Sequence, residues 1–485
     1  MSNGVYFLLA TAALIVGYIV YGTIVAKIFG ADPTRPTPAI SKADGVDFVV
    51  MPTWKVWLIQ LLNIAGVGPV FGPILGALYG PVALLWIVIG SIFAGAVHDY
   101  MSGMLSVRYG GCNLPVIVGN TLGNFAKHLM RVFAVVLLVL VGVVFAQAPA
   151  GLLAKLTPNT VSVTIWLFII FGYYFIATIM PIDKIIGRLY PIFGAVLLIM
   201  AFGMTIMMFV SPDVSFYNTA EWTNQHPKHL PLFPLVFITI ACGALSGFHS
   251  TQSPLMARCL SNERLAKPVF YGSMIAEGFI GLVWATVGMS FYHGPDALLA
   301  AISSGGGPAA VVYESAISLM GGFGGVLAML GVIALPITSG DTAFRAARLT
   351  IAEVFHFSQK PIPSRLLLAV PLFAVGIVLC QVGFTTIWNY FGWSNQSLAC
   401  IVLWSGAVYL ASHHKCHWIC TIPAFFMTIV CVSFICYSPN LGFGIPIKIA
   451  NLLGLIAAIC AFILFILYGT KTKVAEDEKV QKEVG

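Results

Sequence analysis

Charged side chains are scarce in this sequence: Asp, Glu, Lys and Arg together make up 8% of its 485 residues. Soluble globular proteins carry about 25%. Because 59% of the residues are hydrophobic, the chain has too little polar surface for a water-soluble fold, and no room for a separate soluble domain. The composition therefore predicts an integral membrane protein, for which the lipid bilayer is the solvent.

Sequence motifs typical of catalytic and zinc-binding sites are also missing. The sequence has no HExxH motif, and its acidic residues in apolar stretches are scattered singly, whereas an intramembrane enzyme needs such a catalytic set. One group of histidines and cysteines has the residue types that bind zinc, but its spacing fits no standard zinc pattern. We therefore predict no enzyme, no metal and no cofactor apart from a coupling ion. The group consists of His413, His414, Cys416, His417 and Cys420.

The positions of the cysteines and of the charged residues argue against two further classes, disulfide-stabilised proteins and nucleic-acid-binding proteins. Most of the ten cysteines, such as Cys242 and Cys431, are in apolar stretches, where cysteine acts as a small hydrophobic residue, so no disulfide framework is expected. The net charge of +7 would suit nucleic acid in a soluble chain. Here the charges lie in loops and set the orientation in the membrane, and nucleic-acid binding is not expected.

Apolar stretches of about 20 residues recur along nearly the whole chain, which is the length of a membrane-spanning helix. We expect thirteen such helices and hence an all-α polytopic membrane protein. The first reads as a retained helix because it lacks a basic start and a convincing cleavage site. The expected spans are residues 4–26, 55–79, 81–105, 131–151, 161–180, 190–210, 231–256, 269–292, 320–344, 365–385, 387–411, 418–437 and 449–470.

The basic residues indicate the orientation. With the N-terminus outside, only Lys155, Lys228 and Lys448 of the 24 Lys and Arg residues fall on the outer side. Since loops rich in Lys and Arg stay in the cytoplasm, this bias predicts an outer N-terminus and a cytoplasmic C-terminus. The outer loop 211–230 is then a candidate cap or gate.

Glycine and proline interrupt two of the spans. The segment 60–74, QLLNIAGVGPVFGPI, contains Gly66 and Gly68, and the segment 239–254, TIACGALSGFHSTQSP, contains Gly247. Such breaks leave backbone N–H and C=O groups without helical partners, and hydrocarbon cannot satisfy them. Each break must therefore face protein, water or a ligand. Interrupted segments in two corresponding halves are typical of a transporter's substrate site.

The breaks fall in the second and seventh expected spans, so that five spans start with each. Because five is odd, the second set crosses the membrane in the opposite direction, which predicts a 5+5 inverted repeat. The charged tail 475–485 is expected to be disordered. The chain divides into residues 1–54 (an extra helix and a cytoplasmic loop), 55–210 (first repeat), 211–411 (second repeat) and 412–485 (two helices and the tail).

The breaks also suggest how a small anion binds. A half-helix that restarts after a break presents free N–H groups and partial positive charge to a carboxylate. Close packing of helices through glycine is the alternative explanation, although the clustered prolines argue against packing alone. The expected substrate-binding residues are Asn63, Gly66, Gly68, Ser246, Gly247, His249, Ser250 and Thr251.

Ionisable residues at membrane depth are costly and are therefore candidates for ion coupling. His98 and Asp99 are neighbours that point about 100° apart on a helix, so both cannot face one partner helix. We expect one to line a cavity and the other to hold the cytoplasmic loop, in transport or in a structural hydrogen bond. Glu277 stands alone in an apolar span and suits a proton carrier, or a protonated bridge between two helices. His249 can contact the substrate, act as a gate, or form a packed polar cap.

A second ion site is indicated by the stretch 336–341, PITSGD. Hydroxyl and carboxyl oxygens, together with freed backbone carbonyls, suit a hard cation such as Na⁺, so Thr338, Ser339 and Asp341 are candidates. Two alternatives stay open. Hydroxyl groups in membrane helices often bond their own backbone, and Asp341 precedes Arg345 by four residues, which is the spacing of an intrahelical ion pair.

Several stretches in the same order resemble one known family. They are ADGVDFVVMPTW, NIAGVGPVFGPILGALYG, IVIGSIFAGAVHDYMSG, IACGALSGFHSTQSP and SGDTAFRAAR, from about Ala43 to about Trp404, and they are similar to the carbon starvation protein family, CstA. The resemblance implies an inner-membrane transporter with a LeuT-like 5+5 inverted repeat. It also implies uptake of pyruvate, or of peptides in older assignments, commonly coupled to protons. The chain looks shorter at its C-terminal end than the larger members.

Together these features predict a secondary active transporter that imports a small carboxylate, with pyruvate favoured, by ion-coupled alternating access. The coupling ion is H⁺, through Glu277 or the neighbours His98 and Asp99, or Na⁺, through the 338–341 stretch. A peptide transporter of the same fold and a membrane sensor that binds a metabolite without moving it are the alternatives. The expected partners are a small molecule and the lipid bilayer, and the sequence does not indicate an oligomeric state.

Overall fold

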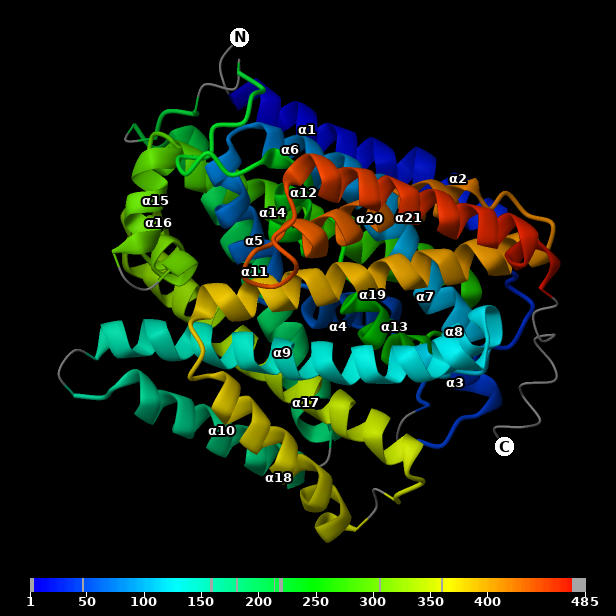
Figure 1. The fold of residues 1–485 in the computed structure, drawn as a ribbon. Helices are drawn as coiled ribbons and strands as arrows, with labels where there is room; N and C mark the ends of the chain where they lie inside the picture. Colours follow the sequence, from blue (N-terminus) through cyan, green and yellow to red (C-terminus); the bar gives the residue numbers. More distant parts are fainter. Residues whose placement is uncertain are drawn as a thin grey trace.

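The computed structural model describes residues 4–45, 48–157, 160–179, 182–212, 214–217, 221–304, 307–358 and 361–472. The regular elements in these ranges are all helical (Figure 1). The helices of eight or more residues are α1 (Gly4–Val16), α2 (Gly22–Phe29), α4 (Thr53–Ile64), α5 (Gly68–Gly76), α6 (Val82–Gly90), α7 (Ala96–Arg108), α8 (Leu114–Leu122), α9 (Asn124–Leu156), α10 (Val163–Ile179), α11 (Ile182–Val210), α12 (Leu232–Thr239), α13 (His249–Ala257), α14 (Gly272–Phe291), α15 (Pro295–Ser303), α16 (Gly307–Met329), α17 (Leu335–Val354), α18 (Ile362–Leu379), α19 (Phe384–Ser412), α20 (Trp418–Tyr437) and α21 (Ile447–Leu467).

Short segments of other helix types join some of these helices into longer rods. The π-helical segment η1 (Gly17–Tyr21) joins α1 to α2, η3 (Ser91–Gly95) joins α6 to α7, and η5 (Lys267–Tyr271) precedes α14. Within the described ranges, nine helical rods are long and apolar enough to cross a membrane, or ten if the bent pair α4 and α5 is one span. The chain is therefore a multi-pass membrane protein.

The expected count of thirteen spans is higher, because four expected spans are short, interrupted or polar. α10 has 17 residues, α12 and α13 are separate helices, α17 contains Asp341 and Arg345, and α19 has a polar turn. The expected span 320–344 is also placed differently: Gly321 (φ 63°, ψ −150°) breaks the helical path within α16, and the helix that follows continues to Val354. The thirteen spans and the 5+5 repeat stay predictions.

Both spans expected to be interrupted are broken. α4 ends at Ile64 and α5 begins at Gly68, and the two helices are bent by 48°. α12 ends at Thr239 and α13 begins at His249, with no helix between them. The local cause at the second break includes Gly243, whose φ of 85° is left-handed and cannot continue a right-handed helix.

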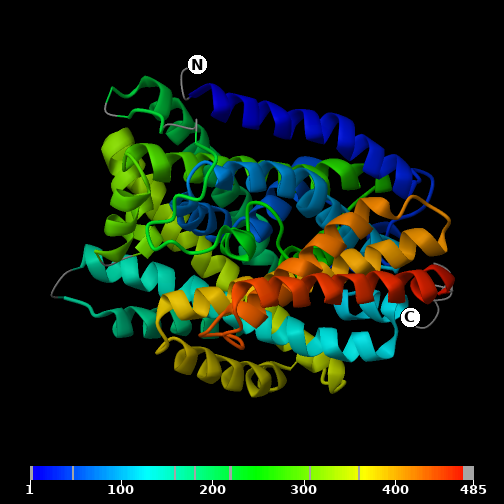
Figure 2. The ribbon, with the colours of Figure 1, turned by 45° about the horizontal axis from the view of Figure 1, so that its top comes forward.

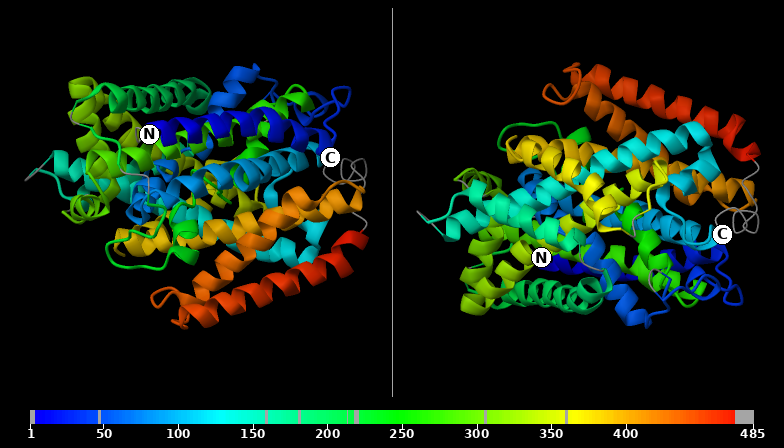
Figure 3. Two further views of the ribbon diagram at one scale, coloured as in Figure 1. Left: turned by 90° about the horizontal axis from the view of Figure 1, so that it is seen from above. Right: turned by 90° about the horizontal axis from the view of Figure 1, so that it is seen from below.

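The broken helices lie inside the bundle. In Figure 1, α9 and α19 run across the middle, where α17 packs along α9 and α13 packs against α7. α1 lies along the upper surface in Figure 2, and α21 lies at the edge of the bundle in both views of Figure 3. Apolar side chains on these outer helices, such as Leu9 and Leu452, are more than half exposed. Such faces suit contact with lipid rather than water.

The expected outer cap covers the end of the first broken span. In its described part, the N–H of Gln225 donates to the Tyr79 carbonyl at 3.2 Å, and the Tyr217 hydroxyl donates to Gln225 Oε1 at 2.9 Å. The ring of His226 lies 4.7 Å from that of Tyr79, and burial there lowers the pKa of His226, with smaller contributions from its basic neighbours. A gating role for this loop stays a prediction.

A buried ion pair fixes the end of α7. Arg108 Nη2 lies 2.9 Å from Glu263 Oε2, and the two side chains are 6% and 0% exposed. The same carboxylate oxygen accepts the N–H of Asp32 at 2.7 Å, and Arg108 also donates to the Gly30 carbonyl at 2.9 Å. These bonds attach the connection after α2, at Gly30 and Asp32, to the end of α7 at Arg108 and to Glu263 in the segment before α14.

Candidate functional site

Four ionisable side chains form one continuous line of contacts inside the bundle. His98 Nδ1 is 2.8 Å from Asp99 Oδ1, and Asp99 Oδ2 is 2.9 Å from His249 Nδ1. His249 Nε2 is 3.3 Å from Glu277 Oε2. The other oxygen of Glu277 accepts the N–H of Gly243 at 3.2 Å. All four side chains are fully buried, and we call these four residues the charged cluster.

Three elements supply the charged cluster. α7 carries His98 and Asp99, α13 begins with His249, and Glu277 lies on α14. A buried charge without a partner is costly, and each group here meets an opposite or complementary group. The hydrogen bond from Gly243 joins the cluster directly to the second break. The structure thus brings together three of the expected ion-coupling residues and one expected substrate-binding residue.

The expectation that one of His98 and Asp99 lines a cavity while the other holds the cytoplasmic loop is not met, because both lie in the charged cluster. Their side chains contact each other, and the Asp99 carboxylate also reaches His249. The angle of about 100° applies to the directions in which the side chains leave the helix, and rotation about the side-chain torsions brings the end groups together. The acids are not isolated either, because Asp99 and Glu277 contact opposite nitrogens of the same imidazole.

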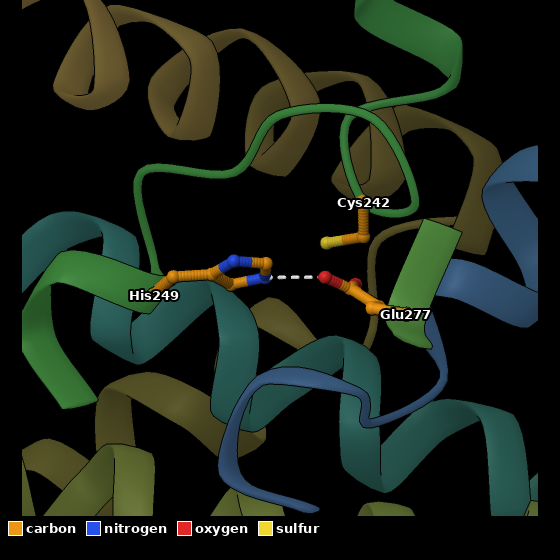
Figure 4. Close-up of side chains that lie close together, drawn as sticks. All are labelled: Cys242, His249 and Glu277. Carbon is orange, nitrogen blue, oxygen red and sulfur yellow. Dashed lines mark ion pairs between the residues drawn. The ribbon is translucent and has the colours of Figure 1, made fainter. Parts of the chain in front are cut away.

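Cys242 lies beside the charged cluster, as Figure 4 shows. Its sulfur, a ring nitrogen of His249 and a carboxylate oxygen of Glu277 lie within 4.8 Å of one another, and all three are ligand types for zinc. Each already has a protein contact: Cys242 Sγ is 3.4 Å from Ser246 Oγ, and His249 contacts Glu277. These residues could hold a metal ion if those contacts were given up. The absence of a metal stays a prediction.

Two amide side chains of α19 satisfy the backbone of the second break. Asn395 Oδ1 accepts the N–H of Phe248 at 2.7 Å and the hydroxyl of Ser246 at 3.2 Å. Gln396 Nε2 donates to the carbonyl of Phe237, near the end of α12, and to that of Leu245 within the break, at 3.0 and 3.1 Å. Sequence reasoning missed both residues, because an amide in an apolar span does not indicate which distant backbone group it meets.

The other hydroxyls of the second break bond within their own segment. Ser250 donates to the Gly247 carbonyl at 2.6 Å, and Thr251 donates to the Phe248 carbonyl at 2.7 Å. Such local bonds are a common use of hydroxyls at the start of a helix. Ser246 differs from them because it faces α19. A substrate-binding role for these residues stays a prediction.

The first break lies beside α13 and α17. Gln60 Nε2 on α4 donates to Ser253 Oγ on α13 at 3.3 Å, and Asn63, one turn further along α4, is buried. On the other side, a Cβ placed on Gly66 would lie 3.5 Å from Ser339 Oγ. The structure therefore brings the Na⁺ candidate Ser339 next to the first break.

Asp341 does not face the same way as Ser339. Its carboxylate lies 3.4 Å from Arg345 Nη2, which is the expected i, i+4 ion pair, and Arg345 also donates to the Ala177 carbonyl of α10 at 2.7 Å. Residues two apart on a helix point in nearly opposite directions. The candidates in 338–341 are therefore divided: Asp341 is directed toward α10 and Ser339 toward the first break.

The two breaks pack closely in this conformation. A Cβ on Gly68 would come under 3.0 Å from the side chain of Cys242, and a Cβ on Gly247 would come under 3.0 Å from backbone atoms of Asn395 and Ala399 on α19. Close packing through glycine, the alternative explanation for these residues, is thus present at both breaks. A ligand can lie between these surfaces only if they move apart.

Gly247→Ala is expected to lower the free energy of unfolding by about 1–3 kcal/mol, as overpacking does. The added methyl group would meet backbone atoms of α19, which cannot rotate away as a side chain can. Gly172→Ala on α10 is the matched control, since nothing lies within 4 Å of its added Cβ and alanine favours a helix by up to about 1 kcal/mol. Thermal unfolding in detergent measures both variants. Equal stability of the two would contradict this packing.

Two broken helices that meet beside buried ionisable groups, within a multi-pass bundle, define a membrane transporter rather than an enzyme. Comparison with known proteins gives the same class. The model of the family "Carbon starvation protein CstA" matches residues 3–169, 157–304 and 294–434. The chain belongs to the CstA family.

Relatives within this family differ in how they are described. An uncharacterized membrane protein of Haemophilus influenzae is 48% identical over 62% of this chain and 94% of its own length. The peptide transporter CstA of Campylobacter jejuni is 27% identical over 88% of this chain and 79% of its own. The pyruvate/proton symporter BtsT of Escherichia coli is 25% identical over 56% and 47%. Among solved structures, the nucleobase-cation-symport-1 family transporter Mhp1 matches with a TM-score of 0.49 and 15% identity, over 88% of this chain and 96% of that one.

Proposed function

We propose that this protein is a secondary active transporter that imports a small carboxylate, with pyruvate favoured, by ion-coupled alternating access. The observation that carries the proposal is the charged cluster, which is fully buried and hydrogen-bonded to the second break through Gly243. Because Glu277 is bonded to the unwound segment, its protonation is linked to whether that segment holds a ligand. One relative, the pyruvate/proton symporter BtsT of Escherichia coli, supports the same substrate and ion.

The charged cluster favours H⁺ as the coupling ion. It offers four titratable groups from three elements with successive contacts of 2.8, 2.9 and 3.3 Å, and such chains of acids and histidines serve as proton relays in membrane transporters. The Na⁺ alternative uses the hydroxyls of Thr338 and Ser339, of which Ser339 lies beside the first break. It is weaker because the Asp341 carboxylate is engaged by Arg345.

The substrate is proposed from the chemistry of the breaks. A carboxylate suits the N-terminal ends of α5 and α13, where backbone N–H groups and the helix dipole favour an anion. Peptide transport is the alternative, supported by the description of other relatives as peptide transporters, and it requires a larger site with two ends. A sensor that binds its ligand without moving it is the second alternative.

We extend the proposal to the arrangement in the membrane. The two breaks lie in the second and seventh of thirteen expected spans, which supports a LeuT-like 5+5 inverted repeat. The distribution of Lys and Arg supports an inner-membrane location with the N-terminus outside and the C-terminus in the cytoplasm.

Uptake of labelled pyruvate into liposomes containing the purified protein tests this proposal. We expect accumulation under an inward H⁺ gradient, no accumulation under an inward Na⁺ gradient alone, and loss of accumulation when a protonophore collapses the pH difference. Competition by dipeptides but not by other small carboxylates would favour the peptide alternative. Binding of pyruvate without accumulation under either gradient would favour the sensor. Accumulation that ignores both gradients would contradict ion coupling.

A further inference from the structure

The second break is already occupied by a side chain of the protein. Asn395 reaches it from α19, and its amide oxygen accepts two hydrogen bonds, from the Phe248 N–H at 2.7 Å and from the Ser246 hydroxyl at 3.2 Å. The amide nitrogen of Asn395 returns a bond to Ser246 Oγ at 3.0 Å. Asn395 and Ser246 are fully buried, so that water does not compete for these groups in this conformation.

The N–H of Phe248 and the hydroxyl of Ser246 are hydrogen-bond donors that a carboxylate can accept from. Phe248 immediately precedes α13, where the helix dipole adds partial positive charge. The next three N–H groups are taken by local bonds, from His249 to the Ser246 carbonyl, from Ser250 to Gly247 and from Thr251 to Phe248. The N–H of Phe248 is bonded instead to the oxygen of Asn395, a neutral acceptor. Hydrogen bonds to an ionised acceptor are stronger than those to a neutral amide.

The neighbouring amide has a different task. Gln396 Nε2 donates to the carbonyls of Phe237 at 3.0 Å and Leu245 at 3.1 Å, which are acceptors that a carboxylate cannot bind. Gln396 therefore satisfies carbonyls that an anion cannot, whereas Asn395 satisfies donors that an anion can also satisfy.

We propose that Asn395 occupies the carboxylate-binding groups of the second break, so that the substrate must displace it in order to bind. The proposal rests on the proposed function for its carboxylate substrate. Displacement cannot be confined to one side chain, because Gly247 packs against the backbone of α19 at Asn395 and Ala399. Exchange of Asn395 for the substrate therefore separates α19 from the second break, which links ligand binding to movement of a whole helix.

Opposite effects of two substitutions test the competition. Asn395→Ala removes the competing acceptor, and we expect the KM for pyruvate uptake to fall several-fold. Asn395→Asp places a charged competitor on the same donors, and we expect the KM to rise by roughly tenfold or more, since bonds to charged acceptors are the stronger ones. Gln147→Ala is the control: its amide also donates to two carbonyls, but those of Cys380 and Val382, which belong to neither break, and its KM should equal that of the wild type.

A second readout does not depend on transport. Stabilisation of the purified protein against heat by pyruvate or formate, compared at equal concentration, should be greatest for Asn395→Ala, intermediate for the wild type and smallest for Asn395→Asp. KM values and stabilisation that shift in the same direction in both variants would overturn the competition and leave the transport proposal intact. The expected order of stabilisation without any transport would support the competition and overturn the proposed function. No stabilisation of any variant by these carboxylates would overturn the competition.

Discussion

Glu277→Gln is expected to reduce uptake driven by a pH gradient to the level of protein-free liposomes. Glutamine keeps the size of the side chain and an oxygen that accepts the Gly243 N–H, so the second break is expected to keep its shape. It cannot take up or release a proton toward His249, whose Nε2 lies 3.3 Å from the carboxylate. Exchange of labelled for unlabelled pyruvate, which needs no net proton movement, should persist.

Two further variants separate the possible causes of this loss. Glu314→Gln removes an exposed carboxylate that accepts a hydrogen bond from the Tyr292 hydroxyl. We expect uptake by this variant to equal that of the wild type. Ser339→Ala removes the hydroxyl next to the first break and should leave proton-driven uptake in place. If accumulation instead followed Na⁺ and failed in Ser339→Ala while Glu277→Gln stayed active, the coupling site would lie on α17.

Arg108→Gln is expected to lower the free energy of unfolding by about 3–5 kcal/mol, the typical effect of removing one partner of a buried ion pair. The Glu263 side chain is 0% exposed. Of the two bonds described above for its Oε2, the substitution removes that from Arg108 and leaves that from the N–H of Asp32. The uncompensated carboxylate cannot reach bulk water without opening the contact between the ends of α2, α7 and the segment before α14.

A second ion pair provides the control for Arg108. Arg131 and Glu353 are 3.7 Å apart with side chains 18% and 36% exposed, and an exposed pair contributes at most about 1 kcal/mol. Thermal unfolding of Arg108→Gln and Arg131→Gln in the same detergent compares the two. Combining Arg108→Gln with Glu263→Gln should recover part of the loss, because two neutral amides leave no buried charge. A loss for Arg108→Gln no larger than that for Arg131→Gln would contradict the structural role.

The sequence was informative where the signal is local. Gly66, Gly68 and Gly247 interrupt apolar runs, and a break in a membrane helix follows from their backbone chemistry alone. Buried ionisable residues likewise stand out because hydrocarbon tolerates so few of them. These two signals are enough to select Asp99, His249 and Glu277 from the sequence alone.

The partners of those residues were not predictable, because they depend on which distant elements pack together. Asn395 lies 147 residues beyond Phe248 and 149 beyond Ser246, inside a segment that resembles any other apolar span. The direction of Asp341 was also undetermined, since the pattern PITSGD suits both a cation site and a helix paired with Arg345. The contact between His98 and Asp99 was also not predictable, because rotation about the side-chain torsions brings together end groups whose starting directions on the helix diverge.

Under the proton coupling proposed above, the close contacts of Gly68 with Cys242 and of Gly247 with α19 bear on leakage of protons across the membrane. Every proton that slips through an open gap without cargo dissipates about 2.3 kcal/mol for each 100 mV of membrane potential. A transporter whose breaks did not close tightly in the absence of substrate would let protons leak across the bilayer. Glycine lets the first break meet Cys242 at Gly68 and lets the second break meet α19 at Gly247, and a larger residue at either position is expected to hold that contact open.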